Sequence, residues 1–210
     1  MSKKIKILAV IHITYTNTFD TLYYEASNNK KFDMQFVLIP FKQDGVEIPV
    51  RVLEEMMLKK GYPYVLGYDE KTQEYLDPKT LNPDIVFVQS PYDAQRISKL
   101  YSISNMRKFA QVYHISYGGT MISYDVPPYD ELFQYHKNEC AGLTAVLSEN
   151  KMIVDYLHKF DLGNHVPLGY IKCDKYLHYR NNPYFSFNKR DDYEYIIAWK
   201  PKMGRQRRRL

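Results

Sequence analysis

The sequence predicts an α/β domain with an open parallel sheet of Rossmann-like type, and two observations lead to this prediction. Short runs rich in Val and Ile recur along the chain, and amphipathic stretches lie between them. The runs are mostly continuous rather than alternating, as expected of strands that are covered on both faces. Strands that alternate with helices form βαβ crossovers, which place helices on both sides of a parallel sheet.

The continuous apolar runs are the predicted strands, at residues 5–13, 36–39, 85–88, 109–116, 144–147, 165–168 and 195–199. The first run is short, contains His12 and lacks a small-residue cleavage site, so it indicates a buried strand rather than a signal peptide. Residues 62–66 are expected to form a short edge strand, and residues 69–80 a surface excursion. No apolar stretch is long enough to cross a bilayer.

The amphipathic stretches between these runs are the predicted helices, at residues 18–27, 50–60, 129–141 and 149–160. Pro49 suits the start of the second helix, and Gly61 is expected to end it. Ser148 is expected to cap the last helix.

Composition indicates a folded domain in a reducing compartment. The chain has 210 residues, of which 45% are apolar and 25% charged, and these are ordinary globular values. Cys140 and Cys173 lie far apart without metal-ligand spacing, which indicates neither a disulfide framework nor a metal site. We therefore expect a soluble, cytoplasmic protein. The 21 tyrosines suit a cleft wall or a wet interface, or reflect a compositional bias.

The net charge of +5 is largely a terminal effect, because four arginines lie in the last six residues. The rest of the chain is nearly neutral, so we expect no nucleic-acid partner. The arginine tail is either solvated or allows peripheral association with anionic lipid at the inner face of the plasma membrane.

The sequence divides into a main domain and the beginning of another. Residues 1–180 are the predicted Rossmann-like domain, residues 181–192 a linker, residues 193–203 the first strand of a second domain, and residues 204–210 a basic tail. A buried-type strand without a covering helix is an incomplete unit. We therefore expect the chain to be truncated.

The usual fingerprints of nucleotide cofactors and hydrolases are absent. There is no G-x-G-x-x-G, no G-x-x-x-x-G-K-[ST] and no G-x-S-x-G. We expect no cofactor of this chain and no metal.

Candidate binding residues follow the predicted strands, because ligands of open parallel sheets bind at the carboxyl ends of strands. After the first strand come Thr14 and Asn17, and after the third come Gln89, Tyr92 and Asp93. Their polar groups suit a hydroxylated or anionic acceptor. The alternatives are that Asn17 or Thr16 caps a helix, and that Asp93 is the N-cap of a turn.

Two further candidates lie close to these loops in the predicted sheet. Tyr117, Gly118 and Gly119 follow the fourth strand, and paired glycines allow either close backbone approach to a ligand or a tight turn. His12 is a candidate general base. The alternative is a buried strand histidine that is bonded to a neighbouring carbonyl, while His114 is expected in the core.

Four stretches resemble the N-terminal part of the CDP-glycerol glycerophosphotransferase family. They are NPDIVFVQSPYD at 82–93, QVYHISYGG at 111–119, LGYIKCD at 168–174 and YIIAWKP at 195–201. The third resembles a G-x-P-x-x-D segment in which Ile171 replaces the proline, and the last a W-x-P strand. The order and spacing of these stretches carry the resemblance, which is weak over the first 80 residues.

The resemblance implies a GT-B architecture of two Rossmann-like domains and a role in teichoic acid or capsule synthesis. It implies a polyol-phosphate or sugar acceptor and a nucleotide-linked donor, CDP-glycerol or a nucleotide sugar. Donor binding and the catalytic histidines are implied for the second domain, so the present chain alone is expected to be inactive. The alternatives are a nucleotide-sugar epimerase-like domain and a non-catalytic α/β binding module.

Overall fold

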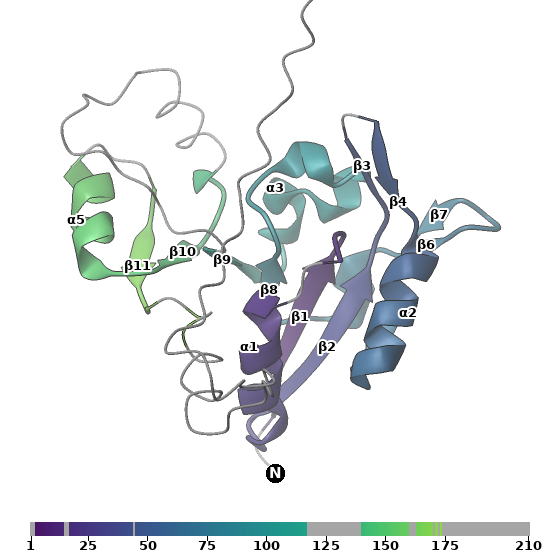
Figure 1. The fold of residues 1–210 in the computed structure, drawn as a ribbon, viewed down its shortest axis with the longest axis horizontal. Helices are drawn as coiled ribbons and strands as arrows, with labels where there is room; N and C mark the ends of the chain where they lie inside the picture. Colours follow the sequence, from purple (N-terminus) through teal and green to yellow (C-terminus); the bar gives the residue numbers. More distant parts are fainter. Residues whose placement is uncertain are drawn as a thin grey trace, which may run out of the picture.

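The computed structural model describes residues 3–14, 17–43, 45–116, 140–159 and 163–169, together with residues 171 and 173. Figure 1 shows its strands and helices. The parallel strands are β1 (Ile5–Ile11), β2 (Phe32–Leu38), β5 (Tyr64–Leu66), β8 (Ile85–Val88), β9 (Gln111–Ile115), β10 (Ala145–Ser148) and β11 (His165–Pro167). Two antiparallel hairpins pair β3 (Phe41–Gln43) with β4 (Val46–Ile48), and β6 (Tyr68–Asp69) with β7 (Glu74–Tyr75).

Helices and short 3-10 turns connect these strands. The α-helices are α1 (Asn17–Ser27), α2 (Val50–Lys60), α3 (Ile103–Met106) and α5 (Lys151–Lys159). The 3-10 turns are η1 (Pro78–Leu81), η2 (Asp93–Gln95) and η3 (Lys99–Tyr101).

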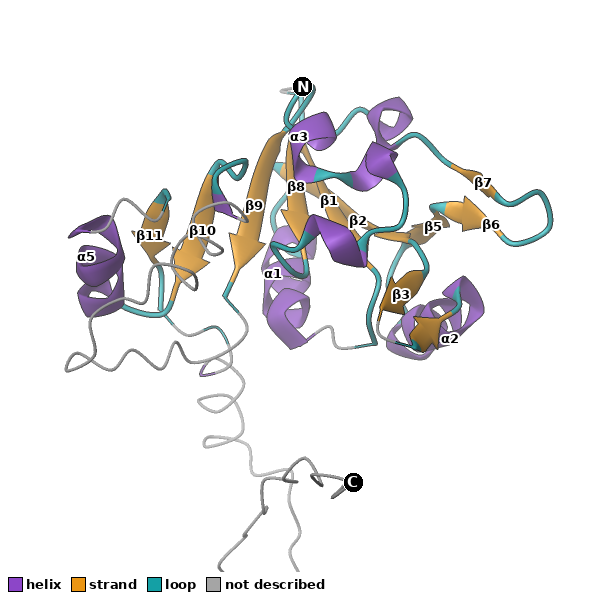
Figure 2. Ribbon diagram, turned by 90° about the horizontal axis from the view of Figure 1, so that it is seen from above, coloured by secondary structure: helices purple, strands orange, loops and turns teal. Residues whose placement is uncertain are grey.

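The main sheet has seven strands in the order β11-β10-β9-β8-β1-β2-β5, and every neighbouring pair is parallel. Figure 2 shows its arrows side by side and pointing the same way. The chain therefore starts in the middle of the sheet, moves to one edge at β5, and crosses back to build the other half from β8 onward. This is the strand order of the Rossmann fold, so the predicted open parallel sheet is confirmed.

Both faces of the sheet are covered, which explains why the strands are apolar without alternation. Along β1, Ile7, Ala9 and Ile11 belong to a core with Phe19 of α1 and Leu53 of α2. The residues in between, Leu8 and Val10, belong to a second core on the other face that includes Tyr101 and Met106. One strand thus anchors both layers of helices.

The predicted strands within the described residues all exist; β8 has the predicted bounds, and the ends of the others are shifted. The first run was expected to continue to residue 13, but β1 ends at Ile11, because the side chain of Gln89 bonds the backbone N–H groups of His12 and Ile13. The short edge strand is confirmed as β5, which pairs with β2. The excursion at 69–80 contains the turn of the β6–β7 hairpin and most of η1.

The helices confirm both predicted ends of α2, which starts after Pro49, and correct the predicted cap of α5. Gly61 ends α2 in the left-handed conformation at a φ of 67°, and its N–H donates to the carbonyl of Leu58, as expected of a helix C-cap. The prediction that Ser148 caps the last helix is wrong, because Ser148 is the last residue of β10. Asn150 takes this role, and its side-chain oxygen accepts from the N–H of Ile153 at 2.9 Å.

Several predictions fall outside the described residues. These are most of the helix at 129–141, the linker at 181–192, the strand at 195–199 within the second-domain segment 193–203, and the basic tail at 204–210. They stay predictions.

Candidate functional site

The strand order places a switch point between β1 and β8. The chain leaves β1 toward β2 on one side and leaves β8 toward β9 on the other. In open α/β sheets the loops that diverge from such a point leave a crevice at the carboxyl ends of the two strands. The loops after β1 and β8 carry Thr14, Gln89, Tyr92 and Asp93. We call this region the carboxyl-edge site.

Gln89 fastens the two strands of the site to each other. Its side-chain oxygen accepts from the N–H of His12 at 2.7 Å and from the N–H of Ile13 at 3.0 Å. Its side-chain nitrogen donates to the carbonyl of Ile13 at 3.2 Å, and the residue is buried. These bonds give Gln89 a defined role in shaping the loop after β1, while contact with an acceptor stays a prediction.

His12 lies directly beyond the end of β1 and is completely buried. Its Nε2 is 3.3 Å from the side-chain oxygen of Gln95, and its ring stacks on that of Phe41 at a centroid distance of 5.9 Å. Since the Gln95 oxygen is an acceptor, the neutral ring carries its proton on Nε2. Within the described part of the chain, Nδ1 has no hydrogen-bond partner.

Burial, followed by the nearby positive charge of Arg96, lowers the pKa of His12 to about 4. The ring is therefore neutral at physiological pH, and an unprotonated Nδ1 is able to accept a proton. A pKa this low makes a weak base, and the burial of the ring separates it from solvent. The alternative of a buried histidine is confirmed, but its partner is the side chain of Gln95 rather than a neighbouring backbone carbonyl.

Arg96 is a buried cation beneath the loop after β8. Its Nη1 donates to the carbonyl of Ser90 at 2.8 Å, and its Nη2 to Oδ1 of Asp93 at 2.6 Å. The same oxygen of Asp93 accepts from the N–H of Ile103 at 2.9 Å. Asp93 thus begins η2 without capping it, and the alternative of Asp93 as the N-cap of this turn is wrong. Its carboxylate ties the loop to the start of α3.

The remaining predicted residues differ in how far the structure describes them. Thr14 is exposed and Tyr92 is half-buried. Asn17 is the first residue of α1, but its side chain lies outside the described residues. Tyr117, Gly118 and Gly119 also lie outside them. Their strand, β9, ends at Ile115 beside β8, and so reaches the same edge.

A second group of polar side chains lies at the carboxyl ends of β9 and β10 and includes His165, the first residue of β11. Ser116 donates to Oε1 of Glu149 at 2.8 Å, and Oγ of Ser148 is 3.0 Å from Nδ1 of His165. Ser148 and His165 are buried, so their bond joins two neighbouring strands inside the protein. The polar edge therefore extends to the ends of β9 and β10.

The sequence predicted the loops of the site but missed the network that links the buried residues Ser90 and Arg96 with the half-buried Gln95. Ser90 donates to the side-chain oxygen of Gln95, and the same oxygen faces Nε2 of His12. The only local signal is that polar residues continue beyond Asp93. Nothing local indicates that Arg96 is buried. His114, expected in the core, is buried, and its Nδ1 is 3.1 Å from the carbonyl of Val88.

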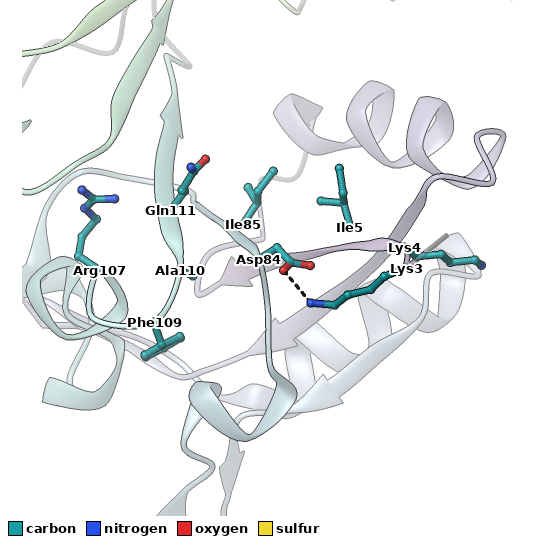
Figure 3. Close-up of a pocket in the computed structure, with 9 residues that line it drawn as sticks. All are labelled: Lys3, Lys4, Ile5, Asp84, Ile85, Arg107, Phe109, Ala110 and Gln111. Atoms are coloured by element: carbon teal, nitrogen blue, oxygen red, sulfur yellow. Dashed lines mark hydrogen bonds and ion pairs between the residues drawn. The ribbon is translucent and has the colours of Figure 1, made fainter. Parts of the chain in front are cut away.

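A groove of about 610 Å³ opens at the opposite end of the sheet, where the parallel strands begin, and Figure 3 shows its lining residues. Lys3, Asp84, Arg107 and Phe109 are among its lining residues, and they come from the segments that precede β1, β8 and β9. We place the candidate site at the carboxyl edge because the switch point and the buried polar network lie there.

Metal binding and membrane spanning find no support in the described ranges. No group of three or more His, Cys, Asp or Glu residues in them is arranged to hold a metal ion. No helix of the described segments is both long and apolar enough to cross a membrane.

The fold and the site define a Rossmann-like α/β domain with a polar carboxyl edge. Comparison with known proteins adds no family: no protein-family model matches the chain, and no curated protein matches it significantly.

Proposed function

We propose that the chain is the acceptor-side domain of a two-domain transferase of GT-B type. Its products would be cell-surface polymers such as teichoic acid or capsule. The single observation that carries the proposal is the position of Thr14, Gln89 and Tyr92 at the switch point of a Rossmann-like sheet, where such folds bind ligands. The resemblance of residues 82–93 and 111–119 to glycerophosphotransferases supports it, since these stretches form β8, β9 and the segments that flank them.

The acceptor would be a polyol phosphate or a sugar. Thr14 is exposed beyond β1 and Tyr92 is half-buried beyond β8, so these residues offer hydroxyl groups to a hydroxyl-rich ligand. The bonds of Gln89 to His12 and Ile13 hold the loop that carries Thr14. This chain would therefore orient the acceptor, and orientation of reactants is a large part of catalysis in group transfer.

The donor, CDP-glycerol or a nucleotide sugar, would bind to a second Rossmann-like domain. Neutralisation of the diphosphate leaving group would also come from that domain. The proposal assigns binding rather than turnover to the present chain. His12 is the candidate base, but its burial and its pKa of about 4 favour a role in shaping the loop.

Binding of glycerol-phosphate oligomers tests the proposal. Saturation-transfer NMR on the wild-type chain should give signals that fall in Thr14→Val and Tyr92→Phe, because each variant removes one hydroxyl and changes little else. Thr72→Val is the matched control, since Thr72 is exposed in the turn of the β6–β7 hairpin. Equal signals in all four proteins would remove the acceptor site.

NMR with a nucleotide-linked donor, added to the oligomer experiment, separates the alternative functions. An epimerase-like domain would bind a nucleotide sugar at this edge and convert it to an epimer, which NMR of the sugar detects. A non-catalytic binding module would bind neither the oligomer nor the donor at Thr14 and Tyr92. Turnover of a nucleotide-linked donor by this chain alone would contradict the assignment to acceptor binding.

A further inference from the structure

Pairs of basic residues precede four strands of the main sheet. Lys3 and Lys4 precede β1, Lys30 and Lys31 precede β2, Lys59 and Lys60 end α2 before β5, and Arg107 and Lys108 precede β9. All of them are exposed. Because the strands are parallel, their starts lie at one edge of the sheet, opposite the carboxyl-edge site. We call these four pairs the basic edge.

Backbone hydrogen bonds show that the strand starts are neighbours. The N–H of Ile5 donates to the carbonyl of Lys31 at 2.8 Å, and the N–H of Asp84 to the carbonyl of Lys6 at 3.0 Å. The N–H of Gln111 donates in turn to the carbonyl of Asp84 at 3.1 Å. With neighbouring strands about 4.8 Å apart, the basic edge extends roughly 20 Å from β9 to β5.

Carboxylates at this end are fewer than the cations, and several of them are already engaged. Asp84 lies 3.4 Å from Nζ of Lys3 and accepts from the N–H of Lys6 at 2.8 Å. Asp77 accepts from the N–H of Lys79 at 2.9 Å. Glu25 near the end of α1 and Asp33 near the start of β2 are further carboxylates of the described residues at this end. Glu54 accepts from the hydroxyl of Tyr64, the first residue of β5, and Asp20 pairs with Lys60.

Most of the cations of the basic edge are not neutralised by an ion pair within the described residues. Lys60 is paired with Asp20 at 2.9 Å, and Arg107 donates to the hydroxyl of Thr144 at 2.6 Å. Within the described part of the chain, Lys4, Lys30 and Lys31 form no ion pair, and neither does Lys59. The basic edge therefore carries an excess of positive charge, although the protein without its tail is nearly neutral.

Exposed apolar side chains accompany these charges. Ile5 is 39% exposed, and Tyr24 and Leu58, near the ends of α1 and α2, are 65% and 64% exposed. Between the starts of β1, β8 and β9 lies the groove of about 610 Å³, whose lining includes Ile5 and Phe109 beside Lys3, Lys4 and Arg107 (Figure 3). The edge thus combines positive charge with apolar groups that reach water.

We propose that the basic edge docks the protein onto an anionic lipid bilayer. Lys and Arg side chains near a membrane are attracted to anionic headgroups, and each contributes to binding. Exposed aliphatic and aromatic side chains stabilise the bound state when they move from water into the boundary between headgroups and acyl chains. A phosphate–sugar backbone would not remove Ile5 and Leu58 from water into an apolar environment. The exposed apolar groups therefore favour a lipid surface over a nucleic acid.

This inference does not rest on the proposed transferase activity, because the basic edge and the carboxyl-edge site lie at opposite ends of the sheet. It also differs from membrane contact through the arginine tail at 204–210, since the four pairs belong to the folded sheet. In the docked protein the carboxyl-edge site would face away from the bilayer.

Flotation of the full chain with lipid vesicles tests the proposal. Vesicles that contain phosphatidylglycerol should bind the wild type, and vesicles of phosphatidylcholine alone should not. Lys30→Gln combined with Lys31→Gln should weaken binding about tenfold or more. Leu58→Ser should weaken binding while leaving its dependence on salt unchanged, because it removes an apolar group and no charge.

Two control proteins decide where the binding resides. Lys42→Gln combined with Lys71→Gln removes the same charge from the two hairpins and should bind like the wild type. Replacement of Arg205, Arg207, Arg208 and Arg209 by Gln removes the charge of the tail. If this tail variant alone loses binding while the Lys30 and Lys31 variant keeps it, the assignment to the basic edge is overturned.

The same proteins test whether the partner is a lipid surface rather than a nucleic acid. Short RNA and duplex DNA are titrated at the salt concentration used for the vesicles. Binding of either nucleic acid that depends on Lys30 and Lys31, without binding to anionic vesicles, would contradict the lipid assignment.

Discussion

Gln89, directly after β8, accepts the backbone N–H of His12, directly after β1, at 2.7 Å. At the point where the two strands diverge, this side-chain bond takes the place of the backbone hydrogen bonds that join the strands of the sheet. The same oxygen accepts the N–H of Ile13 at 3.0 Å, so the side-chain amide of Gln89 holds the first two residues of the loop after β1 in place. The conformation of the carboxyl-edge site therefore depends on Gln89.

Gln89→Ala should destabilise the protein by about 2–4 kcal/mol, because it leaves the buried backbone N–H of His12 and the partly buried N–H of Ile13 without an acceptor. Urea unfolding measures the loss. Gln111→Ala is the matched control, because Gln111 is exposed at the start of β9, and its free energy of unfolding should change by no more than about 0.5 kcal/mol. Equal losses in the two variants would show that the Gln89 bonds contribute little.

His12 should make the folded protein less stable in acid. Its pKa is about 4 in the folded protein and near 6.5 in the unfolded chain. Above pH 6.5 both states are neutral at this residue and it has no effect. As the pH falls from 6.5 to 4 the unfolded chain takes up the proton first, so stability is lost, up to about 3 kcal/mol.

The variant His12→Phe isolates this effect, since a phenyl ring keeps the stacking on Phe41 and cannot titrate. Urea unfolding of both proteins between pH 4 and pH 7 gives the comparison, in which all other titrating groups cancel. The wild type should lose stability relative to the variant as the pH falls. Parallel curves would show that His12 is accessible to protons in the folded state.

Arg96 should set part of the pKa of His12, because its positive charge is the second cause of the lowered value. In Arg96→Met the pKa of His12 should rise above 4 but stay below 6.5, since burial remains the larger cause. An NMR titration of the ring proton of His12 measures it. Lys71→Met, which removes an exposed cation of the β6–β7 turn, should leave the pKa of His12 unchanged.

If Arg96→Met does not fold, Asp93→Asn gives an independent measurement. This variant keeps an oxygen for the N–H of Ile103 and for Arg96, but removes the negative charge that partly neutralises the guanidinium. The pKa of His12 should then fall further. A rise in Asp93→Asn would contradict the role assigned to Arg96.

The sheet could be predicted because its strands are encoded locally. β1, β8 and β9 are continuous Val- and Ile-rich runs, and burial on both faces requires such runs wherever a parallel strand lies. The end of β1 could not be predicted, because the bond that replaces the ladder at His12 comes from Gln89, 77 residues away in the sequence. Ser148 and Asn150 are both suitable N-caps, and only the pairing of β10 with β11 decides between them.

The candidate site was predictable as a location rather than as a network. Thr14, Gln89 and Tyr92 follow apolar runs, and the fold rule for parallel sheets brings such residues to one edge. The burial of Arg96 depends on Ser90 and Asp93 around it, and the sequence pattern does not contain this information. The basic edge could not be predicted either, since its basic pairs lie far apart in the chain and come together only through the parallel strands.

Gly67 should tolerate no side chain, because three neighbours occupy the space that a Cβ atom needs. An added Cβ would lie 2.6 Å from Oη of Tyr101, 2.7 Å from Cγ2 of Val37 and 2.8 Å from Cγ2 of Ile39. Gly67→Ala should therefore cost about 1–3 kcal/mol of stability. Urea unfolding of this variant provides the measurement.

A double-mutant cycle with Tyr101→Phe tests the cause. Tyr101 donates through its hydroxyl to the carbonyl of Leu76 at 2.8 Å, so Tyr101→Phe alone should cost about 1 kcal/mol. Because the phenylalanine lacks the oxygen closest to the new Cβ, Gly67→Ala should cost less in the Tyr101→Phe background than in the wild type. Strict additivity would show that the strain comes from Val37 and Ile39 instead, since residues in contact through a shared clash are expected to couple.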